Sequence, residues 1–162
     1  MLDKLKAIML EMNKGAKINL QSNPELAKVL IIATPEKLFS NGLVWTDENS
    51  QEKTLRHVVN EFVNKNCMYY VMIGEATVSF MNNGKRSFID SIVITGVSRE
   101  GHRLALITPF IRRGGQFEFK PSVWNENTNV TRTTEILNEI FKSKISISSC
   151  PKCNYNVKEN DR

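Results

Sequence analysis

The amino-acid sequence predicts an α+β protein in which helices pack on one face of a mostly antiparallel sheet. Two observations lead to this class. Helical apolar spacing occurs near both ends and in the middle of the chain, and four strand-like segments follow one another at roughly ten-residue spacing. Of the 162 residues, 41% are hydrophobic and 24% are charged. This composition supplies a core and excludes wholesale disorder, a collagen-like chain and a disulfide scaffold. We expect a single domain over residues 1–147 and a polar tail over residues 148–162.

The first segment has the pattern of an amphipathic helix that Gly15 is expected to end. Its apolar residues recur at three- and four-residue spacing and are Leu2, Leu5, Ile8, Met9 and Met12. A polar connector then leads to an early strand over residues 28–33. Thr34, Pro35 and Glu36 next have the order of a short helix start, namely a hydroxyl cap, a proline at the first helical position and an acid near the positive end.

The central helix has the clearest helical pattern in the chain. Polar residues precede it, and its buried face is predicted to comprise Leu55, Val58, Val59, Phe62 and Val63. A last helix is expected to begin at a Thr133 cap. Its buried face is predicted to comprise Ile136, Leu137, Ile140 and Phe141.

Four strands are predicted between these two helices, over residues 68–80, 88–97, 102–111 and 117–123. Their composition is rich in β-branched and aromatic residues, and each turn between them contains glycine. Consecutive strands joined by short turns indicate an antiparallel meander. The early strand over residues 28–33 is expected to join the same sheet.

The charge and cysteine content limit the class of partner and the compartment. The formal net charge is +5, from 22 Lys and Arg against 17 Asp and Glu, which favours acidic partners, nucleic acid included, but also serves solubility alone. No apolar run reaches the ~18 residues of a membrane span, and the first ten residues lack the uninterrupted apolar region of a secretory signal. Three cysteines do not make a disulfide framework. We therefore expect a cytoplasmic, reducing location without membrane contact.

Residues 52–120 resemble small proteins encoded by bacteria and their phages. The resemblance lies in a helix followed by YVMIGEA at residues 70–76, an apolar strand that ends in Gly96, and GHRLALITPF at residues 101–110. In those relatives a tryptophan follows the Glu-Ala pair, where this chain has Thr77. The resemblance implies an α+β accessory protein and assigns no catalytic residue.

The densest positive feature on a predicted turn is the run Arg112, Arg113, Gly114 and Gly115. Two guanidinium groups beside glycines, whose backbone amides approach a ligand closely, suit a phosphate group. The alternative is that both arginines only solvate the tip of a hairpin.

Asp90, Glu118 and Lys120 have the residue types of a metal-dependent nuclease. Two carboxylates would hold a divalent cation and a lysine would orient the attacking water. Glu75, an acid inside an apolar strand, is a fourth candidate, unless it faces solvent or pairs with an arginine on the next strand. Against this site, the strand over residues 102–111 is predicted to separate Asp90 from Glu118 and Lys120.

Cys150 and Cys153 have the two-residue spacing of half a zinc knuckle, which lets both thiolates reach one ion. The remaining ligands would come from Cys67, a histidine or the same pair in a second subunit. The alternative is a thiol pair without metal. No other cofactor is expected.

Together these features favour a non-enzymatic, phage-like accessory protein that works by binding. Its expected partner is another protein or a phosphate-bearing ligand. The apolar stripe of the first helix and the exposed edges of the meander predict a homo-oligomer. Two alternatives stay open: a small metal-dependent nuclease built on Asp90, Glu118 and Lys120, and a virion structural component that needs no site.

Overall fold

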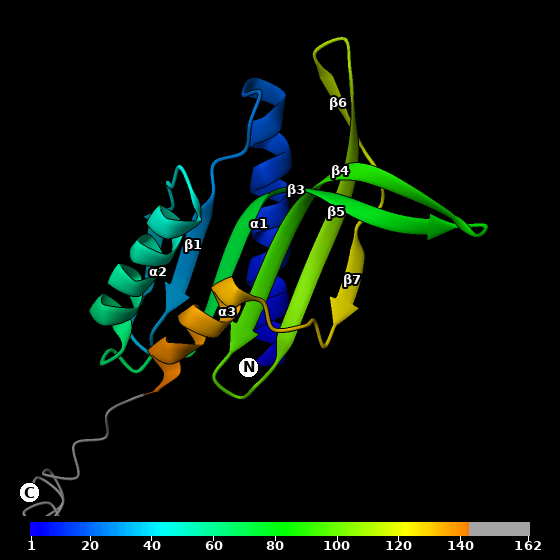
Figure 1. Cartoon of the computed structure of the whole chain (residues 1–162). Helices are drawn as coiled ribbons and strands as arrows, with labels where there is room; N and C mark the ends of the chain where they lie inside the picture. The colour runs from blue at the N-terminus through cyan, green and yellow to red at the C-terminus, as the bar shows by residue number, and fades with distance from the viewer. Residues whose placement is uncertain (143–162) are drawn as a thin grey trace, which may run out of the picture.

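The fold is a seven-stranded antiparallel sheet with helices against it, which confirms the predicted α+β class (Figure 1). It comes from a computed structural model that describes residues 1–142. The strand order is β2-β1-β3-β4-β5-β6, and β7 also pairs with β5. The elements are α1 (Leu2–Ser22), β1 (Val29–Ala33), β2 (Leu38–Gly42), α2 (Glu48–Phe62), β3 (Tyr69–Asn82), β4 (Lys85–Ser98), β5 (Arg103–Arg113), β6 (Gln116–Phe119), β7 (Val123–Glu126), α3 (Arg132–Leu137) and the 3₁₀ helix η1 (Asn138–Phe141).

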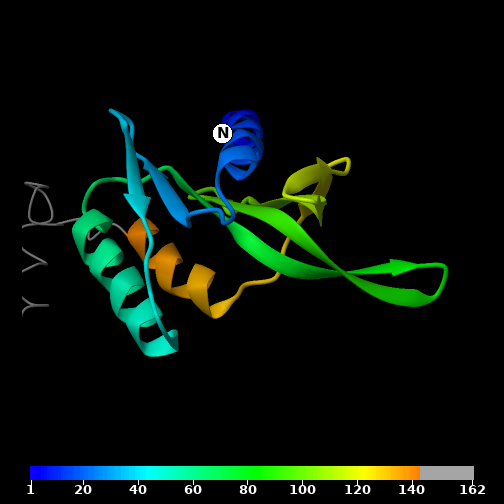
Figure 2. The same ribbon diagram turned by 90° about the horizontal axis from the view of Figure 1, so that it is seen from above.

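The helices cover both faces of the sheet, whereas the sequence suggested one face. Helix α1 packs on one face, and α2 and α3 pack on the other (Figure 2). The reason lies in β3, where Val71 and Ile73 belong to the apolar core under α1, and Tyr70 belongs to the core under α2 and α3. Successive side chains of a strand point to opposite faces, so a continuous apolar run is buried on both.

Helix α1 lies directly on β4. A Cβ atom at Gly96 would lie 2.6 Å from the sulfur of Met9 and 2.9 Å from Cδ1 of Leu5, so any side chain at this position would force these two side chains of α1 to shift. The helix was expected to end at Gly15 but continues to Ser22. Ala16 and Leu20 are buried beyond the glycine, and their burial outweighs the ~1 kcal/mol that glycine costs inside a helix.

The predicted helix start at residues 34–36 is wrong, because this segment forms the turn of the β1–β2 hairpin. The backbone N–H of Thr34 donates to the carbonyl of Lys37 at 3.0 Å. Pro35 fits the second position of a β-turn as well as the first turn of a helix, since both need the same φ angle. Strand β2 then brings Phe39 against Phe62 of α2, with ring centroids 5.0 Å apart.

Helices α2 and α3 each begin with a capping box. Four of the five predicted apolar residues of α2 are buried, and Val63 at its end is half-buried. Helix α3 begins two residues earlier than expected, because Thr131 rather than Thr133 is its cap. Ile136, Leu137 and Ile140 are buried as predicted.

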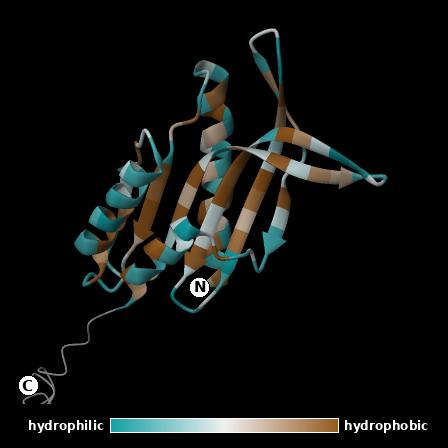
Figure 3. Cartoon of the chain, viewed as in Figure 1, coloured by the Kyte–Doolittle hydropathy of each residue, from teal (hydrophilic) through white to brown (hydrophobic). Residues whose placement is uncertain are grey.

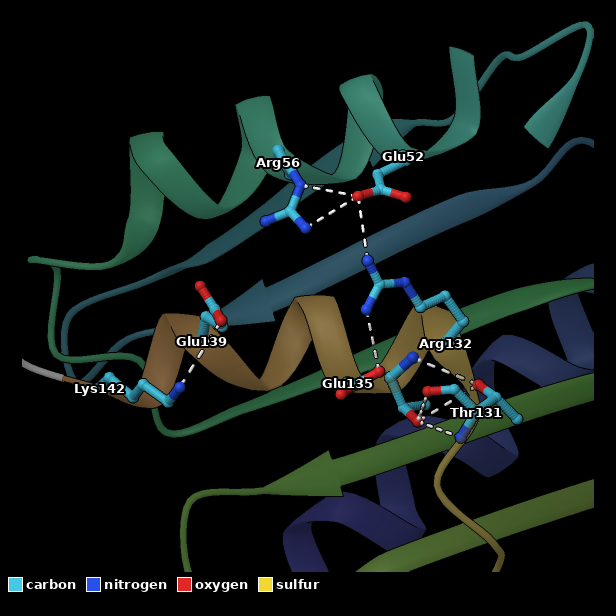
Figure 4. A network of polar contacts seen from close by, with 8 residues as sticks. Glu52, Arg56, Thr131, Arg132, Glu135, Glu139 and Lys142 are labelled. Carbon is cyan, nitrogen blue, oxygen red and sulfur yellow. Dashed lines mark hydrogen bonds and ion pairs between the residues drawn. The ribbon is translucent and has the colours of Figure 1, made fainter. Parts of the chain in front are cut away.

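An ion-pair network joins the exposed surfaces of α2 and α3 (Figure 4). One carboxylate oxygen of Glu52 accepts hydrogen bonds from Arg56 at 2.8 Å and from Arg132 at 3.1 Å. These guanidinium groups, Arg56 first, lower the pKa of Glu52 below its ordinary value. The network links two helices that are far apart in the sequence.

The fourth strand of the predicted meander is two short strands. Strand β6 pairs with residues 110–113 of β5, and β7 pairs with residues 104–107 of the same strand. Pro121 lies between them, and proline has no N–H to donate to a ladder. The other three strands of the meander are present, with β3 and β4 extended up to their shared turn.

Candidate functional site

Two hairpins project from the sheet, β3–β4 and β5–β6 (Figure 1). Strand β5 stays paired with β4 only as far as the Ser91 and Pro109 pair, after which β5 pairs with β6. Strand β1 pairs with β3 only over residues 69–73. Residues 77–90, called the arm below, therefore form a two-stranded ribbon that no other strand within residues 1–142 borders.

The arm exposes large apolar side chains. Phe88 is 68% exposed and Met81 is 65% exposed. Ser79 of β3 lies directly opposite Phe88 of β4, and residues paired in this way share a face of the ribbon. Met81 is two residues from Ser79, and alternate residues of a strand also share a face. Phe88 and Met81 therefore lie on the same face of the arm. Apolar colouring extends from the sheet into the arm, whereas its tip is hydrophilic (Figure 3). The arm thus resembles an interface more than a solvated loop.

The tip of the arm is a tight turn at Asn83 and Gly84. Both residues have positive φ, 48° and 74°, which is the conformation that two-residue hairpin turns need and that Asn-Gly favours. The turn chemistry therefore sets the register of the arm, and the arm emerges from the sheet with defined strand pairing.

The β5–β6 hairpin is held by contacts within the chain. A guanidinium nitrogen of Arg112 lies 2.8 Å from one carboxylate oxygen of Glu75, whose other oxygen accepts from the backbone N–H of Leu26 at 2.7 Å. The Arg112 guanidinium also lies over the rings of Phe110 and Phe117, 5.4 Å from each centroid. Arg112 thus ties the hairpin to β3 and to the segment after α1.

Nearby carboxylates offset part of the positive charge of the predicted phosphate site. Arg113 is 73% exposed at the side chain, and one guanidinium nitrogen lies 3.6 Å from a carboxylate oxygen of Glu118. Gly114 and Gly115 form the turn, with φ of 56° and 78°. Each arginine therefore faces a carboxylate. The predicted contact of a phosphate with residues 112–115 stays a prediction.

A cavity of about 370 Å³ lies between this hairpin and the end of α1, and its wall includes residues 20–24, Arg112 and Phe117. The carbonyl groups at the C-terminus of a helix carry partial negative charge. Since α1 ends at Ser22, its carbonyl groups offset part of the attraction that Arg112 offers an anion in this cavity.

The four nuclease candidates are not gathered into one site. Asp90 lies on the arm, where it accepts from the hydroxyl of Thr77 at 3.0 Å, and Glu118 and Lys120 lie at the β5–β6 hairpin. Glu75 is the acid already paired with Arg112. Within residues 1–142, no group of three or more His, Cys, Asp or Glu side chains is placed to hold a metal ion.

The cysteines divide between a buried position and residues outside the described range. Cys150 and Cys153, the predicted zinc ligands, lie outside residues 1–142. The thiol of Cys67 is buried and donates to the carbonyl of Phe62 at 3.3 Å, and burial raises its pKa. A thiol in this setting is a poor nucleophile, so Cys67 is a core residue.

No family model, curated protein or solved structure matches the chain. The resemblance of residues 52–120 to bacterial and phage proteins stays a prediction. Within the described residues, no helix combines the length and the apolar character that a membrane span requires.

Sequence reasoning missed the arm as a site, although one signal was available. The apolar residues of β3 continue to Met81 and those of β4 begin at Phe88, on both sides of the Asn83-Gly84 turn. In the structure both strands continue to this turn, and β5, with 11 residues, is shorter than β3 and β4, with 14 each. A hairpin longer than its neighbour must extend beyond the sheet.

Proposed function

We propose that the protein is a non-enzymatic interaction protein whose arm, residues 77–90, contacts another protein chain. The observation that carries the proposal is the exposure of Phe88 and Met81 on one face of a ribbon that projects from the sheet. An isolated two-stranded ribbon is marginally stable in water. Burial of its apolar face against a partner would supply the missing second layer.

The composition of the arm favours a protein over a nucleic acid. The Phe88-bearing face combines an apolar centre with Arg86 and Asp90, one charge of each sign. Protein interfaces have an apolar core and a polar rim, whereas a nucleic-acid surface depends on an excess of positive charge. The acidic member would oppose a phosphate backbone.

A phosphate-bearing ligand at the β5–β6 hairpin is the second candidate. It is supported by the exposure of Arg113 and by the Gly114 and Gly115 amides at the turn. Protein binding by the arm suits both a cytoplasmic, phage-like accessory protein and a virion component, since each works by binding another protein.

Site-specific photo-crosslinking tests the proposal. A photoreactive phenylalanine analogue is placed at Phe88 of the full chain, in the cells that encode it, and crosslinked species are identified by mass spectrometry. The matched control carries the analogue at Val44, which is 84% exposed outside the arm. We expect a discrete crosslink from position 88 to a protein chain, and none from position 44.

Two results would contradict the proposal. One is a crosslink yield at position 88 no higher than at position 44. The other is a crosslink from position 88 to nucleic acid alone. The mass of the crosslinked chain also tells whether the partner is a second copy or a different protein.

A further inference from the structure

We infer that the partner on the arm is a second copy of this chain, with the two arms antiparallel about a two-fold axis at Phe88. This inference rests on the proposed function, because it names the partner of the same surface. A two-fold interface uses one patch twice, so the patch must be complementary to itself.

The charges along β4 have this self-complementarity. Arg86 lies two residues before Phe88, and Asp90 lies two residues after it. All three side chains share one face, because side chains alternate along a strand. A two-fold axis at Phe88 exchanges the two flanking positions. It therefore places Arg86 of each copy opposite Asp90 of the other, with the two phenylalanine rings between the two ion pairs.

Neither Arg86 nor Asp90 has an ionic partner among the described residues. They cannot satisfy each other within one strand, because a four-residue separation in an extended chain spans about 13 Å. The hydroxyl of Thr77 gives Asp90 only a neutral hydrogen bond. By contrast, Arg56, Arg112, Arg113 and Arg132 each face a carboxylate in the same chain.

The apolar residues give the same face its centre. Phe88 lies at the middle of the arm, and Met81 lies nearer the tip on the neighbouring strand. In the two-fold arrangement, each Met81 flanks the central pair of rings. The arm projects clear of the three helices in both views (Figures 1 and 2), so a second arm reaches this face without displacing them.

The arms alone form a small contact, which limits the expected affinity. Interfaces below about 1,200 Å² belong to weak or transient complexes. We therefore expect a dissociation constant on the order of 1–100 μM, and one that rises with salt because the charged pairs are exposed at the rim.

Charge complementation between two variants tests the inference. R86E makes both flanking residues acidic, and D90K makes both basic, so each variant alone opposes like charges across the two-fold axis. In an equimolar mixture, both opposed pairs again combine unlike charges. We expect sedimentation velocity of the full-length chains to show self-association weakened at least tenfold for each variant alone, and dimers of wild-type affinity in the mixture.

K53E is the matched control, because Lys53 is an exposed residue of α2 and the charge change equals that of R86E. It should associate as the wild type does. Equal melting temperatures for all variants show that the fold is kept, and F88D should abolish association independently.

The inference is overturned if either charge variant alone associates as tightly as the wild type, or if the mixture associates no better than its components. A wild-type chain that is monomeric at about 100 μM, the weak end of the expected range, also overturns it. In that case a crosslink from Phe88 to a different protein would leave the proposed function standing, so the two failures are distinguishable.

Discussion

The two projecting hairpins differ in how many of their charged and apolar side chains find partners within the chain. In the β5–β6 hairpin, Arg112 and Arg113 face Glu75 and Glu118, and Phe117 packs on Phe110 with ring centroids 5.5 Å apart. In the arm, two large apolar side chains are mostly exposed, and its flanking charges lack ionic partners within residues 1–142. Projection alone therefore does not mark a binding surface. The better candidate for a binding surface is the arm, whose apolar side chains stay exposed and whose flanking charges have no ionic partner within residues 1–142.

The largest contrast is expected between Phe110 and Phe88. Phe110 is 2% exposed and belongs to the core under α1, so Phe110→Ala should lower the free energy of unfolding by about 3–5 kcal/mol. Phe88 is exposed, and Phe88→Ala should stay within about 0.5 kcal/mol of the wild type. Urea denaturation followed by circular dichroism measures both. Equal losses would mean that the arm folds as part of the core.

A smaller contrast is expected within the β5–β6 hairpin. Arg112 has an ion pair and two aromatic contacts, so Arg112→Ala should cost about 1–2 kcal/mol of stability through lost packing and a lost charged hydrogen bond. Arg113 lies at the exposed tip, and Arg113→Ala should cost less than about 0.5 kcal/mol. Thermal unfolding of the two variants checks the order. Two equally neutral substitutions would show that the hairpin is not held by Arg112.

Much of the fold could be predicted from local patterns, because these patterns reflect local physics. The spacing of Leu55, Val58 and Phe62 predicts a helix without any knowledge of its tertiary contacts, and the Asn83-Gly84 pair likewise predicts a hairpin turn. Pro35 and Gly15 misled the prediction because both residues suit two local structures. The tertiary contacts of β2 favour a β-turn over a helix start at Pro35. The buried contacts of the second half of α1 favour a helix that continues through Gly15 over one that ends there.

The site was harder to predict, because it depends on which strands end early. Glu75 was expected to face solvent or to meet an arginine on the next strand. Its partner Arg112 instead lies on β5, with β4 between the two strands. No spacing in the sequence encodes that contact. The exposure of Phe88 likewise follows from β5 leaving β4 at Ser91, which depends on the register of two strands rather than on the composition of either.

If the arm serves only as the contact surface, the rest of the chain should fold without it. The direct test removes residues 78–81 and 86–89. An even number of residues leaves each strand, so the alternation of faces and the pairing at the Asn83-Gly84 turn are kept. Neither apolar core of the described residues contains a residue of the arm, so the shortened chain should fold.

Sedimentation velocity on the full-length and shortened chains, over the same concentration range, is the deciding measurement. We predict a concentration-dependent dimer for the full chain, and a monomer with an essentially unchanged melting temperature for the shortened one. A shortened chain that is folded and still associates as tightly as the full chain would contradict the assignment of the arm as the contact surface.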